Sequence, residues 1–190
     1  MDLLNSAIKA ELRPDYPLAL RYYRKLARQG APLDRIGIYQ AMARCFEKSG
    51  SMSKAGYWHE KAGQGYMRLP TRVMGQQERA YYGLIEFRSA VQDYTPDASM
   101  RKAAKNYMRA LSLCLKAGKE GYSHEMLFAG HLSSKIKDFK RAAEFFADAA
   151  EQLKNEPKLA RGSCELAARY YERSGNHLAA AKLRPLSSLP

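Results

Sequence analysis

The sequence contains no long hydrophobic run. None of its 190 residues lies in a stretch of about 18 apolar residues, the length that a membrane-spanning helix needs. Its first residues, Met1 to Asn5, lack the basic start and the apolar stretch of a secretory signal. These two absences predict a soluble protein of the cytoplasm.

Cysteine is scarce, with three residues far apart in the chain: Cys45, Cys114 and Cys164. An odd number without a CxxC spacing argues against a disulfide framework and against a zinc site built from cysteines. Each lies among apolar residues in a helical pattern. We therefore expect buried thiols that pack as small apolar groups, which suits a reducing compartment.

Residues typical of β-strands are also few, and no segment alternates between apolar and polar residues over a sustained length. The pattern predicts an all-α protein of ten helices, the longest over roughly 71–94 and the last ending near Leu183. Glycine, proline and capping residues predict the breaks between helices. These breaks are expected at Arg13–Asp15, Gln29–Pro32, Ser49–Gly50, Leu69–Thr71, Thr95–Asp97, Ala117–Gly118, Ile136–Asp138, Asn155–Pro157 and Ser174–Asn176.

The motifs of common enzymes are missing: the sequence has no GxxxxGK[ST], GxSxG or HExxH, and no GxGxxG after a strand. His124 and His131 share one face of an expected helix, but no third metal ligand is evident beside them. Glu47 lies beside Arg44 and Lys48, a spacing typical of ion pairs on a helix surface. We therefore expect no enzyme, no metal and no cofactor.

An alanine-centred pattern recurs five times along the chain. A bulky residue precedes each alanine by three positions, and an aromatic residue usually follows it by four. The copies are Tyr16-Ala19-Tyr23, Met52-Ala55-His59, Met100-Ala103-Tyr107, Phe139-Ala142-Phe146 and His177-Ala180-Arg184. These alanines are 36, 48, 39 and 38 residues apart, a period that indicates stacked helical hairpins.

Other small and bulky residues recur in step with these alanines. The recurring sets are Tyr39, Met42, Ala43, Phe46, Gly50, Ala55, His59 and Ala62; Phe87, Ala90, Val91, Tyr94, Ala103, Tyr107 and Ala110; Met126, Ala129, Gly130, Phe146 and Ala149; and Ala167, Ala168, Tyr171, Gly175 and Ala180. In this respect the chain resembles the tetratricopeptide (TPR) family of helical hairpins. Its longer, irregular spacing also resembles that of the soluble attachment proteins (SNAP-like) of membrane fusion.

The resemblance implies an all-α fold, a right-handed superhelical array of about five antiparallel helix hairpins (a TPR-like α-solenoid). The single repeat domain would cover residues 1–184, followed by an irregular tail over residues 185–190. Proteins of this kind are scaffolds or adaptors in protein–protein interaction. We therefore expect a non-enzymatic module that binds a protein partner.

In the TPR family, the first helix of each hairpin lines a concave groove. Carried over by position, the groove residues would be Gln40, Arg44, Arg88, Gln92, Leu127, His131, Glu165 and Arg169. This face is polar and mostly cationic. It is either a site for an acidic or C-terminal peptide, held through arginine–carboxylate hydrogen bonds, or a solvated surface without a ligand.

The segment from Ala98 to Lys119 contains no acidic residue, in a chain of net charge +13. Four of its cations form a basic face on one helix: Arg101, Lys102, Lys105 and Arg109. Such a face either keeps the protein soluble or binds an acidic protein surface, nucleic acid or an anionic membrane. Because the aromatic residues are expected in the core, nucleic acid is the less favoured partner.

Overall fold

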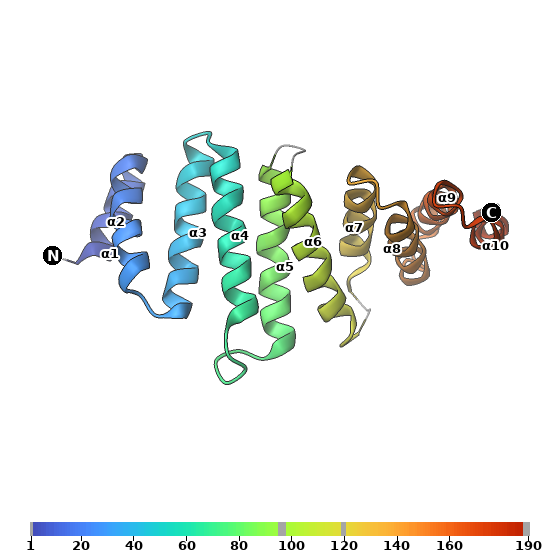
Figure 1. The fold of residues 1–190 in the computed structure, drawn as a ribbon, viewed down its shortest axis with the longest axis horizontal. Coiled ribbons are helices and arrows are strands. Elements are labelled where there is room, and N and C mark those ends of the chain that lie inside the picture. The colour runs from blue at the N-terminus through green and yellow to red at the C-terminus, as the bar shows by residue number, and fades with distance from the viewer. Residues whose placement is uncertain (1, 95–97, 119–120, 188–190) are drawn as a thin grey trace. The chain divides into compact units, whose positions relative to one another are not determined.

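The computed structural model describes residues 2–94, 98–118 and 121–187. Within these ranges the chain forms ten α-helices and no β-strand, as Figure 1 shows, so the expected all-α class is confirmed. None of the helices described is both long and apolar enough to cross a membrane. The helices are α1 (Leu3–Leu12), α2 (Tyr16–Gln29), α3 (Pro32–Lys48), α4 (Met52–Arg68), α5 (Gln76–Asp93), α6 (Ala98–Leu115), α7 (Ser123–Lys135), α8 (Phe139–Gln152), α9 (Pro157–Arg173) and α10 (His177–Ser187).

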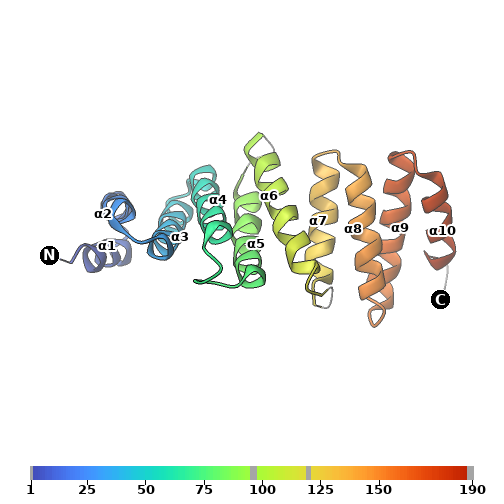
Figure 2. The same cartoon turned by 60° about the horizontal axis from the view of Figure 1, so that its bottom comes forward.

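The chain divides into two compact units, Met1–Leu113 and Cys114–Pro190. In the first unit, each helix from α1 to α5 packs against the next one along the chain (Figure 1). In the second unit, α7, α8, α9 and α10 pack side by side in the same order (Figure 2). The single domain expected over residues 1–184 stays a prediction.

The five repeated alanines all lie in the core. Ala19, Ala55, Ala103, Ala142 and Ala180 are buried, as the alanine-centred pattern predicts. A small side chain at such a position lets two helices approach closely, and a larger one would have to displace its neighbours. The alanines of the repeat therefore occupy the buried positions on these helices that the sequence pattern predicts.

Four of the turns between consecutive helices close with the same backbone hydrogen bond. In each turn, the N–H of the residue just before the next helix donates to the carbonyl five residues earlier, at 2.8–3.0 Å. Gly50, Lys137 and Gly175 precede that residue in three of these turns and have left-handed backbone angles, with φ of 75°, 63° and 83°. The four pairs are Asp15–Ala10, Ser51–Phe46, Asp138–Ser133 and Asn176–Tyr171.

Glycines of α4 allow close contact with both neighbouring helices. A Cβ atom built on Gly63 would lie 2.8 Å from the ring of Phe87 on α5, and one on Gly65 would lie 2.6 Å from Ile36 on α3. The sequence suggests that these glycines only weaken the helix. In the structure their lack of a side chain leaves room for Phe87 of α5 and Ile36 of α3.

The expected helix over 71–94 begins later, at Gln76, so this boundary was wrong by five residues. The N–H groups of Val73 and Met74 both bond to the carbonyl of Pro70, which forms a turn instead of a helix. The guanidinium of Arg79 donates to the carbonyl of Leu69 and holds this turn against α5.

Among the large apolar side chains of α5, Leu84, Phe87 and Val91 are buried, whereas Tyr81 and Ile85 are exposed. At the other end of the chain, α10 continues to Ser187 and so includes three residues of the expected irregular tail. The remaining residues, 188–190, lie outside the described part of the chain.

Candidate functional site

An apolar groove runs between α1, α2 and α3 in the first unit. It has a volume of about 690 Å³, and α1 lines it with Leu4 and Ile8, α2 with Leu26, and α3 with Leu33 and Ile38. Leu4, Ile8 and Leu33 are 47%, 41% and 47% exposed, which is unusual for three large aliphatic residues around one hollow. An exposed apolar concavity of this kind is typical of a binding surface.

Arg44 and Asp34 line the same groove and give its lining one cation and one carboxylate. Nε of Arg44 lies 3.5 Å from Oε1 of Glu11, and Nζ of Lys48 lies 3.5 Å from the same oxygen. The Arg44 and Lys48 side chains are 50% and 52% exposed, whereas Glu11 is only 10% exposed. Two cations share the carboxylate of Glu11, so this ion cluster beside the groove has one positive charge in excess.

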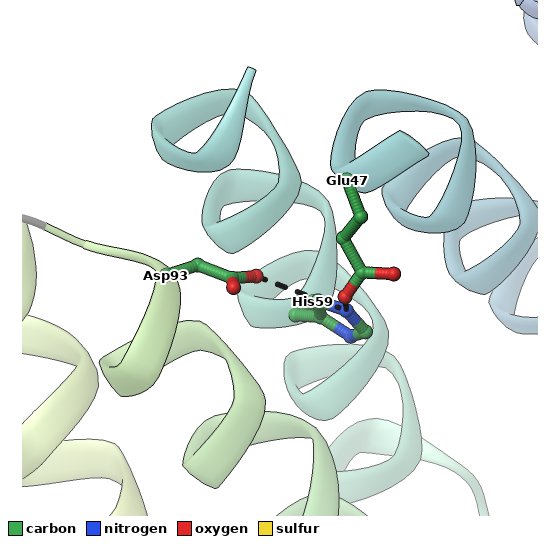
Figure 3. A group of neighbouring side chains, drawn as sticks. All are labelled: Glu47, His59 and Asp93. Carbon is green, nitrogen blue, oxygen red and sulfur yellow. Dashed lines mark hydrogen bonds and ion pairs between the residues drawn. The ribbon is translucent and has the colours of Figure 1, made fainter. Parts of the chain in front are cut away.

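A polar cluster joins α3, α4 and α5; we call Glu47, His59, Glu86 and Asp93 the His59 cluster. Figure 3 draws three of its members, Glu47, His59 and Asp93. Nδ1 of His59 lies 2.8 Å from Oε2 of Glu86, and Nε2 lies 3.0 Å from Oε1 of Glu47. Oδ2 of Asp93 lies 3.9 Å from the same Nε2. His59 therefore supplies at most one positive charge to three carboxylates.

Burial and charge act in opposite directions on the ionisable groups of the His59 cluster. Burial lowers the pKa of His59, but the hydrogen bonds and charges of Glu86 and Glu47 outweigh it and leave this pKa raised. Burial raises the pKa of Asp93 to about 6, with His59 lowering it and Glu47 raising it further. Oδ2 of Asp93 is buried and has no hydrogen-bond partner among the residues that the structure describes.

The four cations of the basic face are all exposed on α6. Ala103, Tyr107 and other apolar residues of the same helix are buried. Lys102 and Arg109 also line a hollow of about 280 Å³, together with Arg68 of α4. Nζ of Lys102 lies 2.9 Å from Oε1 of the buried Glu60, so the hollow keeps two further cations beside this ion pair.

The residues expected to line one groove have different surroundings in the structure. Arg44 lines the apolar groove, but Gln40 donates to Oε1 of Glu86 at 2.6 Å and so supports the His59 cluster. Arg88 is partly buried, whereas Gln92 is exposed near the end of α5. In the second unit, His131 and Arg169 are exposed, and the His131 ring packs edge-on against Phe146 at 4.9 Å.

Sequence reasoning missed the His59 cluster and the aliphatic lining of the groove. The expected surface pair of Glu47 with Arg44 and Lys48 is wrong, because Glu47 bonds to His59 while both cations bond to Glu11. The available signal was His59 itself, which occupies a place where the repeat expects an aromatic residue. A polar side chain at a core position needs a hydrogen-bond partner. For His59 the partners are Glu47 on α3 and Glu86 on α5.

Comparisons with known proteins give a fold but no family. No protein-family model matches the chain, and no curated protein sequence is similar to it. Among solved structures, the chain is similar to BtubC (BKLC) from P. vanneervenii, with a TM-score of 0.55 and 18% sequence identity. The similarity covers 95% of this chain and 75% of that protein. At this identity it shows the fold alone, and it supports a helical repeat protein without distinguishing TPR from attachment-protein repeats.

Proposed function

We propose that this chain is a non-enzymatic helical-repeat scaffold or adaptor that binds an acidic amphipathic segment of a protein partner in the apolar groove. The observation that carries this proposal is the exposure of Leu4, Ile8 and Leu33 around one hollow that Arg44 also lines. An amphipathic helix presents an apolar stripe to such a groove and keeps its charged residues at the rim.

The fold that we propose for this function is an array of five antiparallel hairpins, of the TPR or the attachment-protein type, wound into a right-handed superhelix. The shared hydrogen bond in four turns supports it, because these turns lie where the repeat places the middle of a hairpin. The burial of all five repeated alanines supports it as well. Each hairpin would bury apolar surface against the next.

Charge favours an acidic occupant over a neutral one. The excess positive charge of Arg44 and Lys48 beside Glu11 is half-exposed, so a carboxylate near these side chains gains attraction at a low desolvation cost. The net charge of +13 attracts an acidic partner over a longer range. The apolar lining then provides most of the affinity, because burying one large aliphatic side chain contributes roughly 1.5–3 kcal/mol.

Site-specific crosslinking tests the proposal. A photoreactive amino acid replaces Leu33 in the groove, or Leu159 on α9 as a control with similar exposure. We expect the Leu33 variant to capture a protein segment with several acidic residues, and the Leu159 variant not to capture it. Capture of only RNA or DNA, lost on nuclease treatment, would contradict the proposal.

A synthetic peptide with the captured sequence then allows affinities to be compared by fluorescence anisotropy. Ile8→Asp should weaken binding at least about tenfold, because it places a charge among apolar contacts. Ile85→Asp is the matched control, since Ile85 is 43% exposed and lies on α5 outside the groove. Equal affinities of the two variants would exclude the groove as the binding surface.

The basic face of α6 supports a second candidate, the binding of nucleic acid or an anionic membrane. Arg101, Lys102, Lys105 and Arg109 are exposed together on one helix, which suits a row of phosphates. Single-stranded RNA, duplex DNA and phosphatidylserine vesicles, each titrated at two salt concentrations, distinguish the ligands. Binding that falls steeply with salt and is lost in Arg101→Gln/Lys105→Gln would support this candidate, and no binding at low salt would exclude it.

A further inference from the structure

We propose that Glu47, His59 and Asp93 bind a zinc ion that links α3, α4 and α5. Each residue offers one ligand atom, and the three atoms all lie within 4.8 Å of one another. One ligand comes from each of three consecutive helices, as Figure 3 shows. The proposal does not depend on the protein-binding groove, because the His59 cluster uses other residues.

The distances suit a tetrahedral site. Zinc binds imidazole nitrogen and carboxylate oxygen at about 2.0–2.2 Å, so ligand atoms at tetrahedral angles lie roughly 3.3–3.6 Å apart. Nε2 of His59 lies 3.0 Å from Oε1 of Glu47 and 3.9 Å from Oδ2 of Asp93. These separations lie on either side of the required value, and the third, between Glu47 and Asp93, is at most 4.8 Å, so the three ligand atoms would have to shift on binding.

Glu86 fixes the histidine in the orientation that a metal needs. Its Oε2 accepts a hydrogen bond from Nδ1 of His59 at 2.8 Å, which leaves Nε2 directed at Glu47 and Asp93. Gln40 donates to the other oxygen of Glu86 at 2.6 Å. A carboxylate behind a ligating histidine sets the ring tautomer and strengthens the nitrogen as a ligand.

Asp93 provides an independent indication that a cation belongs here. Its side chain is only 8% exposed, and its buried Oδ2, directed at His59, has no hydrogen-bond partner within residues 2–94, 98–118 and 121–187. An unpartnered carboxylate oxygen is costly to bury, and a coordinated cation would remove that cost. Together the four residues carry three carboxylates against one imidazole, so a divalent ion would offset two of the three negative charges.

The ligand set favours zinc over calcium or magnesium. One imidazole and two carboxylates suit a first-row divalent metal, whereas calcium and magnesium prefer sites made only of oxygen atoms. The Glu47 side chain is 37% exposed, so water has access to the fourth position of a tetrahedron. Because the ligands hold three helices together, we assign the ion a structural role.

Calorimetric titration of the full, chelator-treated chain with zinc chloride tests the site. We expect one zinc ion per chain and a higher melting temperature with zinc. Asp93→Asn keeps the side-chain shape and removes the buried charge, so it should fold and lose zinc binding. His59→Gln should also lose it. His124→Ala is the matched control, because His124 is exposed in the second unit and should keep full affinity.

Glu86→Gln separates a positioning role from ligation. It should keep the one-to-one stoichiometry and weaken zinc affinity by about 10- to 100-fold, because it changes the group behind the histidine and not a ligand. Melting curves without metal confirm that each variant is folded. The proposal would be overturned if the native chain showed no saturable site, if Asp93→Asn bound zinc as tightly as the native chain, or if His124→Ala abolished binding.

Discussion

Replacing Gly63 by alanine tests the close contact between α4 and α5. Alanine is normally the better helix former, so this change in the middle of a helix should stabilise the protein. Here the new Cβ would lie 2.8, 2.9 and 3.0 Å from three atoms of the Phe87 ring, which is buried in the core. We therefore expect Gly63→Ala to lower the free energy of unfolding.

The magnitude follows from two opposing effects. Helix propensity favours alanine by about 1 kcal/mol. Overpacking a tightly packed core costs about 1–3 kcal/mol, because the ring or the helices must shift. The net loss is about 0–2 kcal/mol. Gly37 on α3 has no atom within 4 Å of its Cβ position, so Gly37→Ala should gain up to about 1 kcal/mol.

Thermal and guanidinium unfolding of the two variants measure the difference. A difference of about 1–3 kcal/mol separates their melting temperatures by about 2–12 °C in a chain of this length. The second unit offers the same comparison. A Cβ on Gly130 would lie 2.9 Å from the Phe146 ring, whereas Gly162 has nothing within 4 Å. Gly130→Ala should destabilise the protein relative to Gly162→Ala.

Equal stabilisation by Gly63→Ala and Gly37→Ala would refute the reasoning. It would mean that α4 and α5 are farther apart than the structure places them, and that Gly63 is only a weak helix former. A loss in both variants would instead point to a general intolerance of the helices to alanine. Only opposite signs support packing as the cause.

Three further predictions concern turns, core alanines and thiols. Gly175→Ala should cost about 1–2 kcal/mol in guanidinium unfolding, because its φ of 83° is left-handed, whereas Lys137→Gly should be neutral or stabilising. Ala142→Leu and Ala103→Leu should each cost about 1–3 kcal/mol, since both side chains are buried; unchanged melting temperatures would make the repeat register wrong. Burial raises the pKa of Cys45 from 9.0 to about 11. As pH rises, the thiol therefore loses its proton in the unfolded chain before it does so in the folded protein. The free energy of unfolding should fall as pH rises from 9 towards 11. Thiol labelling at pH 8 should be slow in the native protein and fast in denaturant.

The helices and the core alanines were predictable because their signals are local. Glycine, proline and capping residues mark the turns, and burial at the alanine positions follows from helical spacing within single helices. The start of α5 was not predictable in this way. Residues 71–75 contain no proline, and their turn depends on the bond from Arg79 to the carbonyl of Leu69.

The candidate sites depend on contacts between helices, which the sequence pattern does not contain. Glu47 and Asp93 are 46 residues apart and meet only because α3, α4 and α5 pack in order. Leu33 looks like a core residue when it is judged by its type alone. Its exposure results from the geometry of three helices around the groove, which leaves part of the aliphatic surface uncovered.

The shared turn geometry bears on how the length of this chain can change. Asp138 and Asn176 immediately precede α8 and α10 and make the same backbone hydrogen bond, and they are 38 residues apart. The segment of residues 138–175 therefore begins and ends at turns with the same backbone hydrogen bond. Duplication or deletion of such a segment needs no new connection. Insertion of a second copy of residues 138–175 would add one more pair of helices, equivalent to α8 and α9, with the same turn geometry at both ends.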